Sequence, residues 1–202
     1  MKMKANLHYC EQRSDEWFQL RLGKVTASHF STARSNGSGR KTYMMKLLAE
    51  RMTGIPHENY SAKWMDEGSE LEPEAREYYE KVKGVEVEQI GFVDIGDVGA
   101  SPDGFVGDEG MIEIKCPFPS THLGYILKGT LPSEHKAQVQ GQLWVCERKW
   151  VDFISYDPRV SNRPMFVIRV KRDEKYINEL NAKVSVFVEE LKALEVKANI
   201  PF

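Results

Sequence analysis

The sequence predicts a mixed α/β (α+β) fold in which a central mixed β-sheet is flanked by helices. Apolar residues follow helical spacing through much of the first 83 residues, and a β-meander, a helix, two strands and a last helix are expected after them. The 202 residues include 41% apolar and 29% charged residues, a composition typical of a soluble globular protein with a sizeable core. We therefore expect a single domain over residues 1–202.

Seven segments have the apolar spacing or the end signals of helices. Ser14 or Asp15 can cap the first helix, Thr26 the second and Asp173 the last, and Gly54 is suited to end the third. Pro73 fits a first helical turn better than a helix interior, which places the start of the fourth helix near Leu71. The expected helices cover 14–22, a segment that begins at Thr26, 42–54, 71–83, 119–128, 133–146 and 173–197.

Four stretches are expected to form strands because β-branched and aromatic residues are prominent in them. Within 101–117, a Gly-Asp-Glu-Gly turn separates two of these strands and predicts a hairpin. Segment 35–41, SNGSGRK, is expected to be a flexible loop because glycine and serine dominate it. The expected strands lie in 85–95, in the two arms of 101–117, in 149–158 and in 164–172.

Composition excludes several classes of protein. Cys10, Cys116 and Cys146 are odd in number, widely spaced and without a C-x-x-C pair, so neither disulfides nor a zinc site is expected and a reducing cytoplasm fits. No apolar run approaches the roughly 18 residues of a membrane helix, and the N-terminus lacks the apolar region of a secretion signal. The net charge of −2 argues against a protein that coats nucleic acid by bulk charge, but a local basic groove stays open.

The stretch SPDGFVGDEGMIEIKCP suggests catalytic chemistry. It places Asp103 ten residues before Glu113, and Lys115 two residues after Glu113. On a strand, Glu113 and Lys115 share one face while Ile114 points to the other. A hairpin that brings Asp103 near Glu113 needs a proton or a cation between the two carboxylates.

Mg²⁺ is suited to such a site, because it binds one or two carboxylates together with water and phosphate oxygens. The backbone carbonyl of Ile114 is a further candidate ligand. Lys115, crowded by the metal and apolar walls, can have a lowered pKa and can orient or deprotonate a water that attacks a phosphodiester. The alternative is an exposed strand with an ordinary Glu–Lys pair. The flanking isoleucines favour a central strand, where unpaired charges are costly.

Seven blocks of sequence, taken together, resemble the lambda exonuclease family of viral-type recombination nucleases. They are WFQLRLGKVTAS, GSELEPEAREYYE, SPDG, IEIKCP, AQVQGQLWV, YDPR and RDEKY, in this order from about Trp17 to Tyr176. The resemblance implies a restriction-endonuclease-like core with the PD-(D/E)xK set of active-site residues. It also implies a Mg²⁺-dependent enzyme, with Mn²⁺ as a substitute, that digests linear double-stranded DNA processively from 5′ ends and leaves 3′ single strands. A homotrimeric ring, a single-strand annealing protein as partner, and the cytoplasm of a bacterium or phage-infected host are implied as well.

The same resemblance implies roles for individual acids. Asp103 and Glu113 match the family's metal ligands, and Lys115 matches its catalytic lysine. Glu72 matches a further acid that is a second metal ligand or positions water, with Glu70 and Glu74 as rivals on the same acidic helix.

The family also holds the 5′-phosphate of DNA in a pocket, and four residues match it: Arg21, Ser28, Ser101 and Gln138. An arginine offers a fork of donors to a phosphate, and a serine at a helix start lies near free backbone N–H groups. The alternatives without a role in phosphate binding are a surface arginine, a helix-capping serine, a serine in a turn and an exposed glutamine.

Weaker candidates lie outside these blocks. Met65 or Trp64 occupies the place of the family's apolar wedge between DNA strands, and Arg40 in the 35–41 loop can follow the DNA backbone or simply be solvated. His135 either faces the site or lies in solvent. Trp17, Trp144 and Trp150 are interpreted as core residues.

Three functions remain to be distinguished: the exonuclease, a sequence- or structure-specific endonuclease on the same core, and a catalytically silent DNA-end binding module. The last expected helix carries an apolar face that either packs on the sheet or serves subunit contacts. Its residues are Val184, Phe187, Val188 and Leu191.

Overall fold

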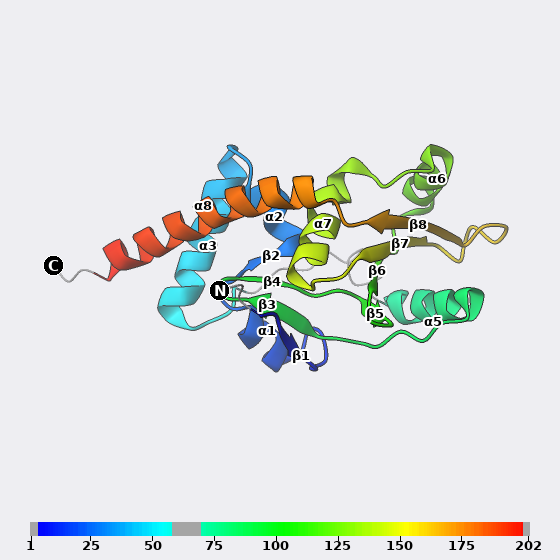
Figure 1. Ribbon diagram of the computed structural model, residues 1–202, viewed down its shortest axis with the longest axis horizontal. Coiled ribbons are helices and arrows are strands. Elements are labelled where there is room, and N and C mark those ends of the chain that lie inside the picture. The colour runs from blue at the N-terminus through cyan, green and yellow to red at the C-terminus, as the bar shows by residue number, and fades with distance from the viewer. Residues whose placement is uncertain (1–3, 58–69, 200–202) are drawn as a thin grey trace.

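The computed structural model describes residues 4–57 and 70–199 (Figure 1). Its helices are α1 (Asp15–Arg21), α2 (Phe30–Ala33), α3 (Ser38–Thr53), α5 (Glu72–Lys83), α6 (Pro119–Lys128), α7 (Lys136–Val145) and α8 (Glu174–Ala198), with 3₁₀ turns η1 (Ala27–His29) and η2 (Ser133–His135). Its strands are β1 (Asn6–His8), β2 (Val25–Thr26), β3 (Phe92–Ile95), β4 (Val98–Ala100), β5 (Gly104–Val106), β6 (Gly110–Lys115), β7 (Trp150–Tyr156) and β8 (Met165–Lys171).

The strands form two mixed four-stranded sheets, in the orders β1-β3-β4-β2 and β5-β6-β7-β8. In each sheet one parallel pair, β2 with β4 or β6 with β7, accompanies antiparallel pairs. The mixed α/β class is confirmed, although the strands divide between two sheets and do not share one central sheet. Figure 1 shows α2, α3 and α8 on one side of the molecule and α5 and α6 towards its opposite end.

Helix ends follow the expected chemistry. The Ser14 hydroxyl accepts a hydrogen bond from the backbone N–H of Trp17 at 3.3 Å, and Asp173 caps α8 in the same way. Pro73 lies in the first turn of α5, where the absence of its N–H costs no helical hydrogen bond. Gly54 ends α3 with a φ of 70°, a conformation that glycine adopts without strain.

Two predictions about the N-terminal part of the chain are wrong. The 35–41 loop is shorter than expected, because α3 begins at Ser38 and its first turn uses the serine, glycine and cations of that segment. Thr26 makes no side-chain cap bond, because it lies in β2 and is followed only by the short η1 and α2.

The sequence did not predict the short strands of the first sheet. In 85–95 the expected strand is reduced to Phe92–Ile95, with an isolated bridge between Glu88 and Phe105 before it. Strands β1, β2 and β4 have two or three residues each, too few for an alternating pattern to be recognised.

Strand β6 is covered on both faces, which explains its nearly continuous apolar sequence. Met111 belongs to the larger core cluster, which includes residues of α7, whereas Ile112 and Ile114 pack with Tyr79 of α5. Glu113 alternates with these isoleucines, faces the side of Met111 and is only 2% exposed. A carboxylate buried in the middle of a sheet requires partners, and these define the site described below.

Helix α8 packs against α2, α3 and α7. The apolar residues of its predicted face are buried in this packing, so they contribute to the core and not to a free surface; they are Val184, Phe187, Val188 and Leu191. In the described parts of the chain, no helix is both long and apolar enough to cross a membrane.

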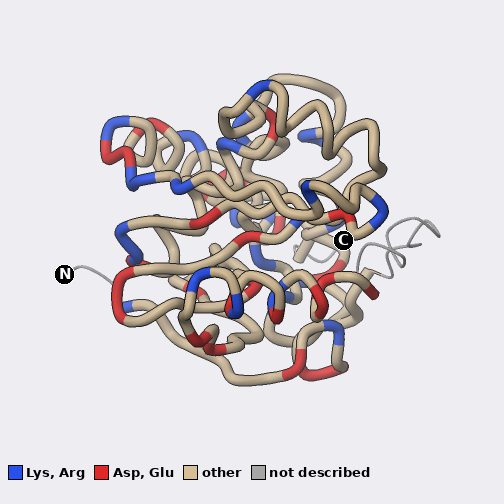
Figure 2. Tube along the Cα trace, turned by 90° about the vertical axis from the view of Figure 1, so that its right-hand side faces the viewer, with Lys and Arg blue, Asp and Glu red and all other residues tan. Residues whose placement is uncertain are grey.

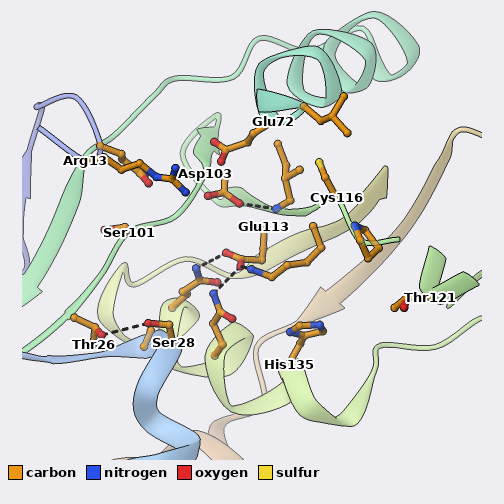
Figure 3. A pocket seen from close by; sticks show the side chains of 18 of the residues that line it. Arg13, Thr26, Ser28, Glu72, Ser101, Asp103, Glu113, Cys116, Thr121 and His135 are labelled. Carbon is orange, nitrogen blue, oxygen red and sulfur yellow. Dashed lines mark hydrogen bonds and ion pairs between the residues drawn. The ribbon is translucent and has the colours of Figure 1, made fainter. Parts of the chain in front are cut away.

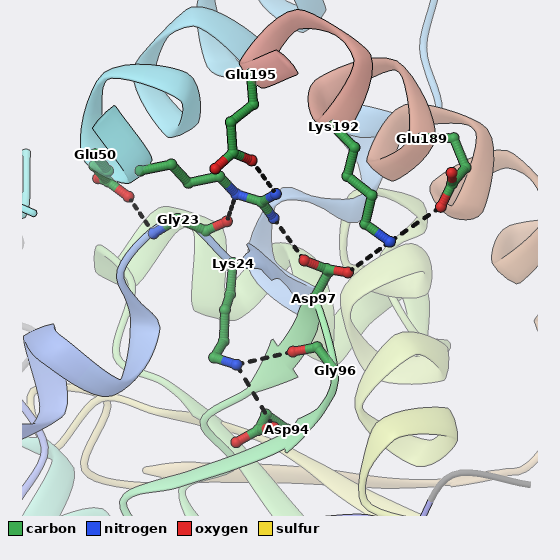
Figure 4. A network of polar contacts seen from close by, with 10 residues as sticks. Gly23, Lys24, Glu50, Asp94, Gly96, Asp97, Glu189, Lys192 and Glu195 are labelled. Carbon is green, nitrogen blue, oxygen red and sulfur yellow. Dashed lines mark hydrogen bonds and ion pairs between the residues drawn. The ribbon is translucent and has the colours of Figure 1, made fainter. Parts of the chain in front are cut away.

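A polar network centred on Arg51 joins α3 and α8 to the first sheet. Figure 4 shows its partners Gly23, Asp97 and Glu195. The Arg51 guanidinium contacts Asp97 of the β3–β4 turn at 2.8 Å and Glu195 of α8 at 3.1 Å. Its Nε donates to the carbonyl of Gly23 at 2.8 Å. A side chain at Gly23 would meet the Arg51 Cγ at 2.5 Å, so a glycine is needed where the two segments cross.

We expect Arg51→Ala to lower the free energy of unfolding by about 2 kcal/mol, because Glu195 and the Gly23 carbonyl lose the Arg51 contact and Asp97 keeps only the more exposed Lys192. The Arg51 side chain is 13% exposed. Lys192→Ala is the matched control, because Lys192 pairs with the same Asp97 but is 46% exposed, and its loss should cost under about 1 kcal/mol. Urea denaturation monitored by circular dichroism measures the free energy of unfolding of both variants. Equal losses of stability would contradict the central role of Arg51 in this network.

Candidate active site

The β5–β6 hairpin brings Asp103 and Glu113 together, as Figure 3 shows, and Lys115 lies beside Glu113. Asp103 immediately precedes β5, and its Oδ2 accepts a hydrogen bond from the backbone N–H of Ile114 at 2.6 Å. Lys115 places its Nζ 2.5 Å from Oε1 of Glu113. All four residues line a cavity of about 710 Å³. The alternative of an ordinary exposed Glu–Lys pair is wrong, because Glu113 is buried.

Helix α7 holds the Glu113 carboxylate from the opposite side. The amide nitrogens of Gln138 and Gln142 donate to its two oxygens at 2.6 Å and 2.5 Å. Sequence reasoning missed Gln142, although its position four residues after Gln138 places both on one face of a helix. Among the described buried polar side-chain atoms, Oε1 of Gln142 is the one without a hydrogen-bond partner.

These contacts shift the ionisation of the site. Burial, followed by the charges of Glu113 and Glu72, raises the pKa of Asp103 well above its usual range. Burial by itself would lower the pKa of Lys115, but the carboxylates of Glu113 and Asp103 outweigh it and the pKa is raised. A lowered pKa was expected from the sequence for a lysine crowded by a metal and apolar walls. The pKa is raised here because the negative charges of Glu113 and Asp103 outweigh the effect of burial on the ammonium group.

Glu72 starts α5 and lines the same cavity, whereas its rivals Glu70 and Glu74 do not. Arg76, one turn further on, contacts the Glu72 carboxylate at 2.7 Å and donates to the backbone carbonyl of Asp103 at 3.2 Å. Glu72 is thereby tied to the hairpin through Arg76. This geometry is compatible with either of its predicted roles.

The donor set suits a hard cation. In the described part of the chain no three Asp, Glu, His or Cys side chains are arranged to hold a metal ion. Asp103 and Glu113 supply two carboxylates, however, and the N–H and carbonyl of one strand residue point to the same edge. Since the Ile114 N–H faces Asp103, its carbonyl faces that edge as well. Two carboxylates, a carbonyl and water are ligands that Mg²⁺ accepts, and the unpartnered Gln142 oxygen is a further acceptor at this place.

A second group of polar residues lies beside the carboxylates. The Arg21 guanidinium stacks on Trp17 with 4.0 Å between its carbon and the ring centroid, and its Nη1 donates to the Ser101 hydroxyl at 2.9 Å. The indole N–H of Trp17 donates to the same hydroxyl at 2.9 Å. Trp17 is therefore more than a core residue, because it lines the cavity and fixes Arg21. Burial lowers the pKa of Arg21 to about 10, and the side chain stays charged at neutral pH.

Ser28 lies in the same cavity, in a cluster with Thr26 and His29. The Ser28 hydroxyl lies 3.3 Å from the Thr26 hydroxyl and 3.2 Å from Nδ1 of His29. Burial lowers the pKa of His29 to about 4, so its ring is neutral. The expected help from a helix start is absent, because η1 and α2 are too short for an appreciable dipole. What Ser28 offers is its hydroxyl.

The remaining candidates have different outcomes. Gln138 and His135 line the cavity, which confirms that His135 faces the site. Arg40 lies elsewhere: it pairs with Glu190 of α8 at 2.8 Å and donates to a backbone carbonyl of α2. Met65 and Trp64 fall outside the described residues. Cys10, Cys116 and Cys146 are free thiols, as predicted.

Gln12 was also missed. Its amide nitrogen donates to the backbone carbonyls of Pro102 at 2.9 Å and Ile90 at 3.1 Å, which fixes the chain just before Asp103. The segment that carries Gln12 has no helical or strand periodicity, and the sequence therefore gave no sign of this contact.

Comparison with known proteins places these features in a family. Residues 16–149 match the family model of the YqaJ-like viral recombinase domain. The crystal structure of LHK-Exo, an alkaline exonuclease from Laribacter hongkongensis, is 41% identical with a TM-score of 0.86, covering 92% of this chain and 96% of that chain. A structure of LHK-Exo in complex with dAMP gives a TM-score of 0.87 over the same shares, again at 41% identity.

Two further proteins are similar. A phage-related exonuclease from Haemophilus somnus 129PT shares the fold, at 15% identity and a TM-score of 0.70 over 87% of this chain and 96% of that chain. ExoD of Escherichia coli (strain K12) is 32% identical over 72 residues, which are 36% of this chain and 80% of ExoD. The resemblance to lambda-exonuclease-like recombination nucleases and the restriction-endonuclease-like fold class are confirmed.

Replacement of Asp103 by Asn should stabilise the metal-free protein at neutral pH. A carboxyl group whose pKa is raised by folding adds stability at low pH and loses it as the pH rises through the folded-state value. Asn keeps an acceptor for the Ile114 N–H without the charge. In chelator we expect Asp103→Asn to unfold with a free energy higher by about 1 kcal/mol near pH 7, and the advantage should vanish near pH 4.

The control for this measurement is Asp108→Asn, which removes an exposed acid from the turn of the same hairpin. Its effect should be within about 0.5 kcal/mol at both pH values. An Asp103→Asn advantage that shrinks as the pH rises would contradict the raised pKa.

Proposed function

Because the chain belongs to the YqaJ-like viral recombinase family, we propose that it is a metal-dependent DNA exonuclease. Its proposed substrate is linear double-stranded DNA, digested processively from 5′ ends to leave 3′ single strands for annealing recombination. The observation that carries the proposal is the Asp103–Glu113–Lys115 group, in which Glu113 is buried, beside the Arg21–Ser101 pair in one cavity. The similarity to an alkaline exonuclease over nearly the whole chain supports it.

Asp103, Glu113 and the Ile114 carbonyl would hold Mg²⁺ or Mn²⁺, with Glu72 as a further ligand or a water-positioning acid. When bound, such a cation supplies charge stabilisation at the scissile phosphate and lowers the pKa of a water. Gln138 and Gln142 keep both oxygens of Glu113 in place, so the carboxylate needs little rearrangement. Lys115 contacts Glu113 at 2.5 Å, and its ammonium would orient the attacking water. Once a bound cation neutralises the neighbouring carboxylates, the ammonium would lose a proton to solvent, and the resulting neutral amine would deprotonate that water.

Arg21, Ser28, Ser101 and Gln138 would bind the 5′-phosphate of the digested strand. Arg21 and Ser101 are already joined at 2.9 Å, and Trp17 limits the freedom of the guanidinium, so the donors are arranged before DNA arrives. Gln138 connects this pocket to Glu113. A terminal phosphate held at a fixed place relative to the carboxylates would set the bond that is cut, one nucleotide from the end.

Processivity requires that the enzyme stay on its DNA. Positive and negative positions are intermixed along the tube of Figure 2, and the net charge is −2, so bulk attraction offers little retention. A homotrimeric ring around the duplex would retain it by topology instead. A single-strand annealing protein that receives the 3′ strand completes the proposed role.

Digestion of linear duplex DNA with Mg²⁺ tests the enzyme directly. We expect the wild type to release nucleotides from linear duplex and to spare closed circular duplex, and Lys115→Ala to lower the rate at least about 100-fold. Cleavage of the circle would favour an endonuclease, and binding without hydrolysis would favour a silent end-binding module. Lys149→Ala, which removes an exposed lysine paired with Glu109, should digest DNA at the wild-type rate.

A second prediction concerns the end of the DNA. Wild type should digest a 5′-phosphorylated duplex faster than a 5′-hydroxyl duplex, and Arg21→Gln should remove most of this preference, because the guanidinium is the charged donor of the pocket. Rates measured with each duplex labelled at its 3′ end give the ratio. A preference that survives Arg21→Gln unchanged would mean that the 5′-phosphate binds elsewhere.

A further inference from the structure

The YDPR block has no role in the function proposed so far, yet it forms a fixed turn beside the site. The block covers Tyr156 to Arg159, at the end of β7 and just beyond it. Asp157 is fully buried and accepts a hydrogen bond from the backbone N–H of Arg159 at 3.0 Å. The Arg159 guanidinium donates two hydrogen bonds to the same carboxylate, from Nε at 2.8 Å and from Nη2 at 3.0 Å. The head of this arginine is therefore held in one orientation.

The sheet places Arg159 next to the catalytic group. Strands β6 and β7 are parallel, with Lys115 opposite Ser155, so the segments that follow both strands leave the sheet at the same edge. Arg159 lines the cavity together with Lys115. In the order β5-β6-β7, Asp103 lies on one side of β6 and Arg159 on the other. Arg21, joined to Ser101, lies on the Asp103 side.

A purely structural role for Arg159 would be the neutralisation of Asp157. A second arginine–aspartate pair in the same sheet allows this role to be compared. Arg169 of β8 makes the same bidentate contact with the buried Asp152, to which its Nε and Nη2 each donate a hydrogen bond at 2.8 Å. The two arginine side chains are similarly exposed, 54% for Arg159 and 50% for Arg169. Arg169, however, lies over the ring of Trp150 and does not line the cavity. The position of Arg159 is what distinguishes the pair.

We propose that Arg159 contacts a backbone phosphate of the digested strand on the 3′ side of the scissile bond. The inference rests on the proposed nuclease function. A strand whose 5′ end is held at Arg21 and whose scissile bond lies at Asp103 and Glu113 continues across β6 towards β7, where Arg159 is exposed. A guanidinium whose orientation is fixed by a carboxylate loses little freedom when it binds phosphate, and this geometry suits arginine better than lysine.

The salt dependence of DNA binding tests this inference. Binding of a 5′-phosphorylated duplex, labelled at its far end, is measured by fluorescence anisotropy in chelator over a series of salt concentrations. We expect Arg159→Gln to weaken binding about threefold to tenfold and to reduce the slope of log K against log salt by about 0.9. Arg169→Gln changes the net charge equally and should leave both quantities at the wild-type value.

A substrate change locates the contact. A neutral methylphosphonate at the first or second phosphodiester beyond the scissile bond should weaken wild-type binding to a similar degree. With Arg159→Gln the same substitution should have no further effect, because both changes remove one interaction. If Arg159→Gln does not fold, Arg159→Lys, which keeps the charge, replaces it; we expect it to keep the salt slope and to lose part of the methylphosphonate effect.

The outcomes separate the two proposals. Wild-type protein that neither binds nor digests linear duplex overturns the proposed function. Wild-type activity, together with equal salt slopes for Arg159→Gln and Arg169→Gln or with additive methylphosphonate effects, overturns the inference about Arg159 alone.

Discussion

The candidate site depends on the burial of one carboxylate, that of Glu113, in the middle of a sheet that is covered on both faces. A carboxyl group in such a place is tolerated because Lys115 and Gln138 contact one of its oxygens and Gln142 contacts the other. These partners come from β6 itself and from α7, so the packing of that helix on the sheet fixes the carboxylate. Asp103 then lies close enough for its ionisation to be opposed by the neighbouring charges.

This arrangement explains why the second sheet is built as it is. The antiparallel pair β5–β6 brings residues ten positions apart to one end of the sheet, and the parallel pair β6–β7 adds a neighbouring loop at the same edge. The first sheet contributes Ser101, just after β4, and α1 contributes Arg21. Segments distant in sequence therefore place arginine and serine side chains on the two sides of one pair of acids, where the proposed function has them bind phosphate.

Much of this was visible in the sequence because it is local. The alternation of Glu113 and Lys115 with isoleucines gave the strand, its faces and its burial, and the caps Ser14 and Asp173 gave helix starts within a residue. What could not be predicted depends on contacts between distant segments. Gln12 acts through backbone carbonyls 78 and 90 residues away, and three strands are too short to leave a pattern. The raised pKa of Lys115 reflects the balance between burial and two charges, which requires three-dimensional positions.

Gln138 lines the cavity and also anchors Glu113. Under the proposed function, a movement of α7 would therefore disturb end recognition and hydrolysis together. Arg21 and Ser28 belong instead to α1 and η1, whereas Glu113 is held by β6 and α7. Under the proposed function, substitutions at Arg21 or Ser28 would therefore alter the choice of DNA end while the packing that fixes Glu113 stays intact.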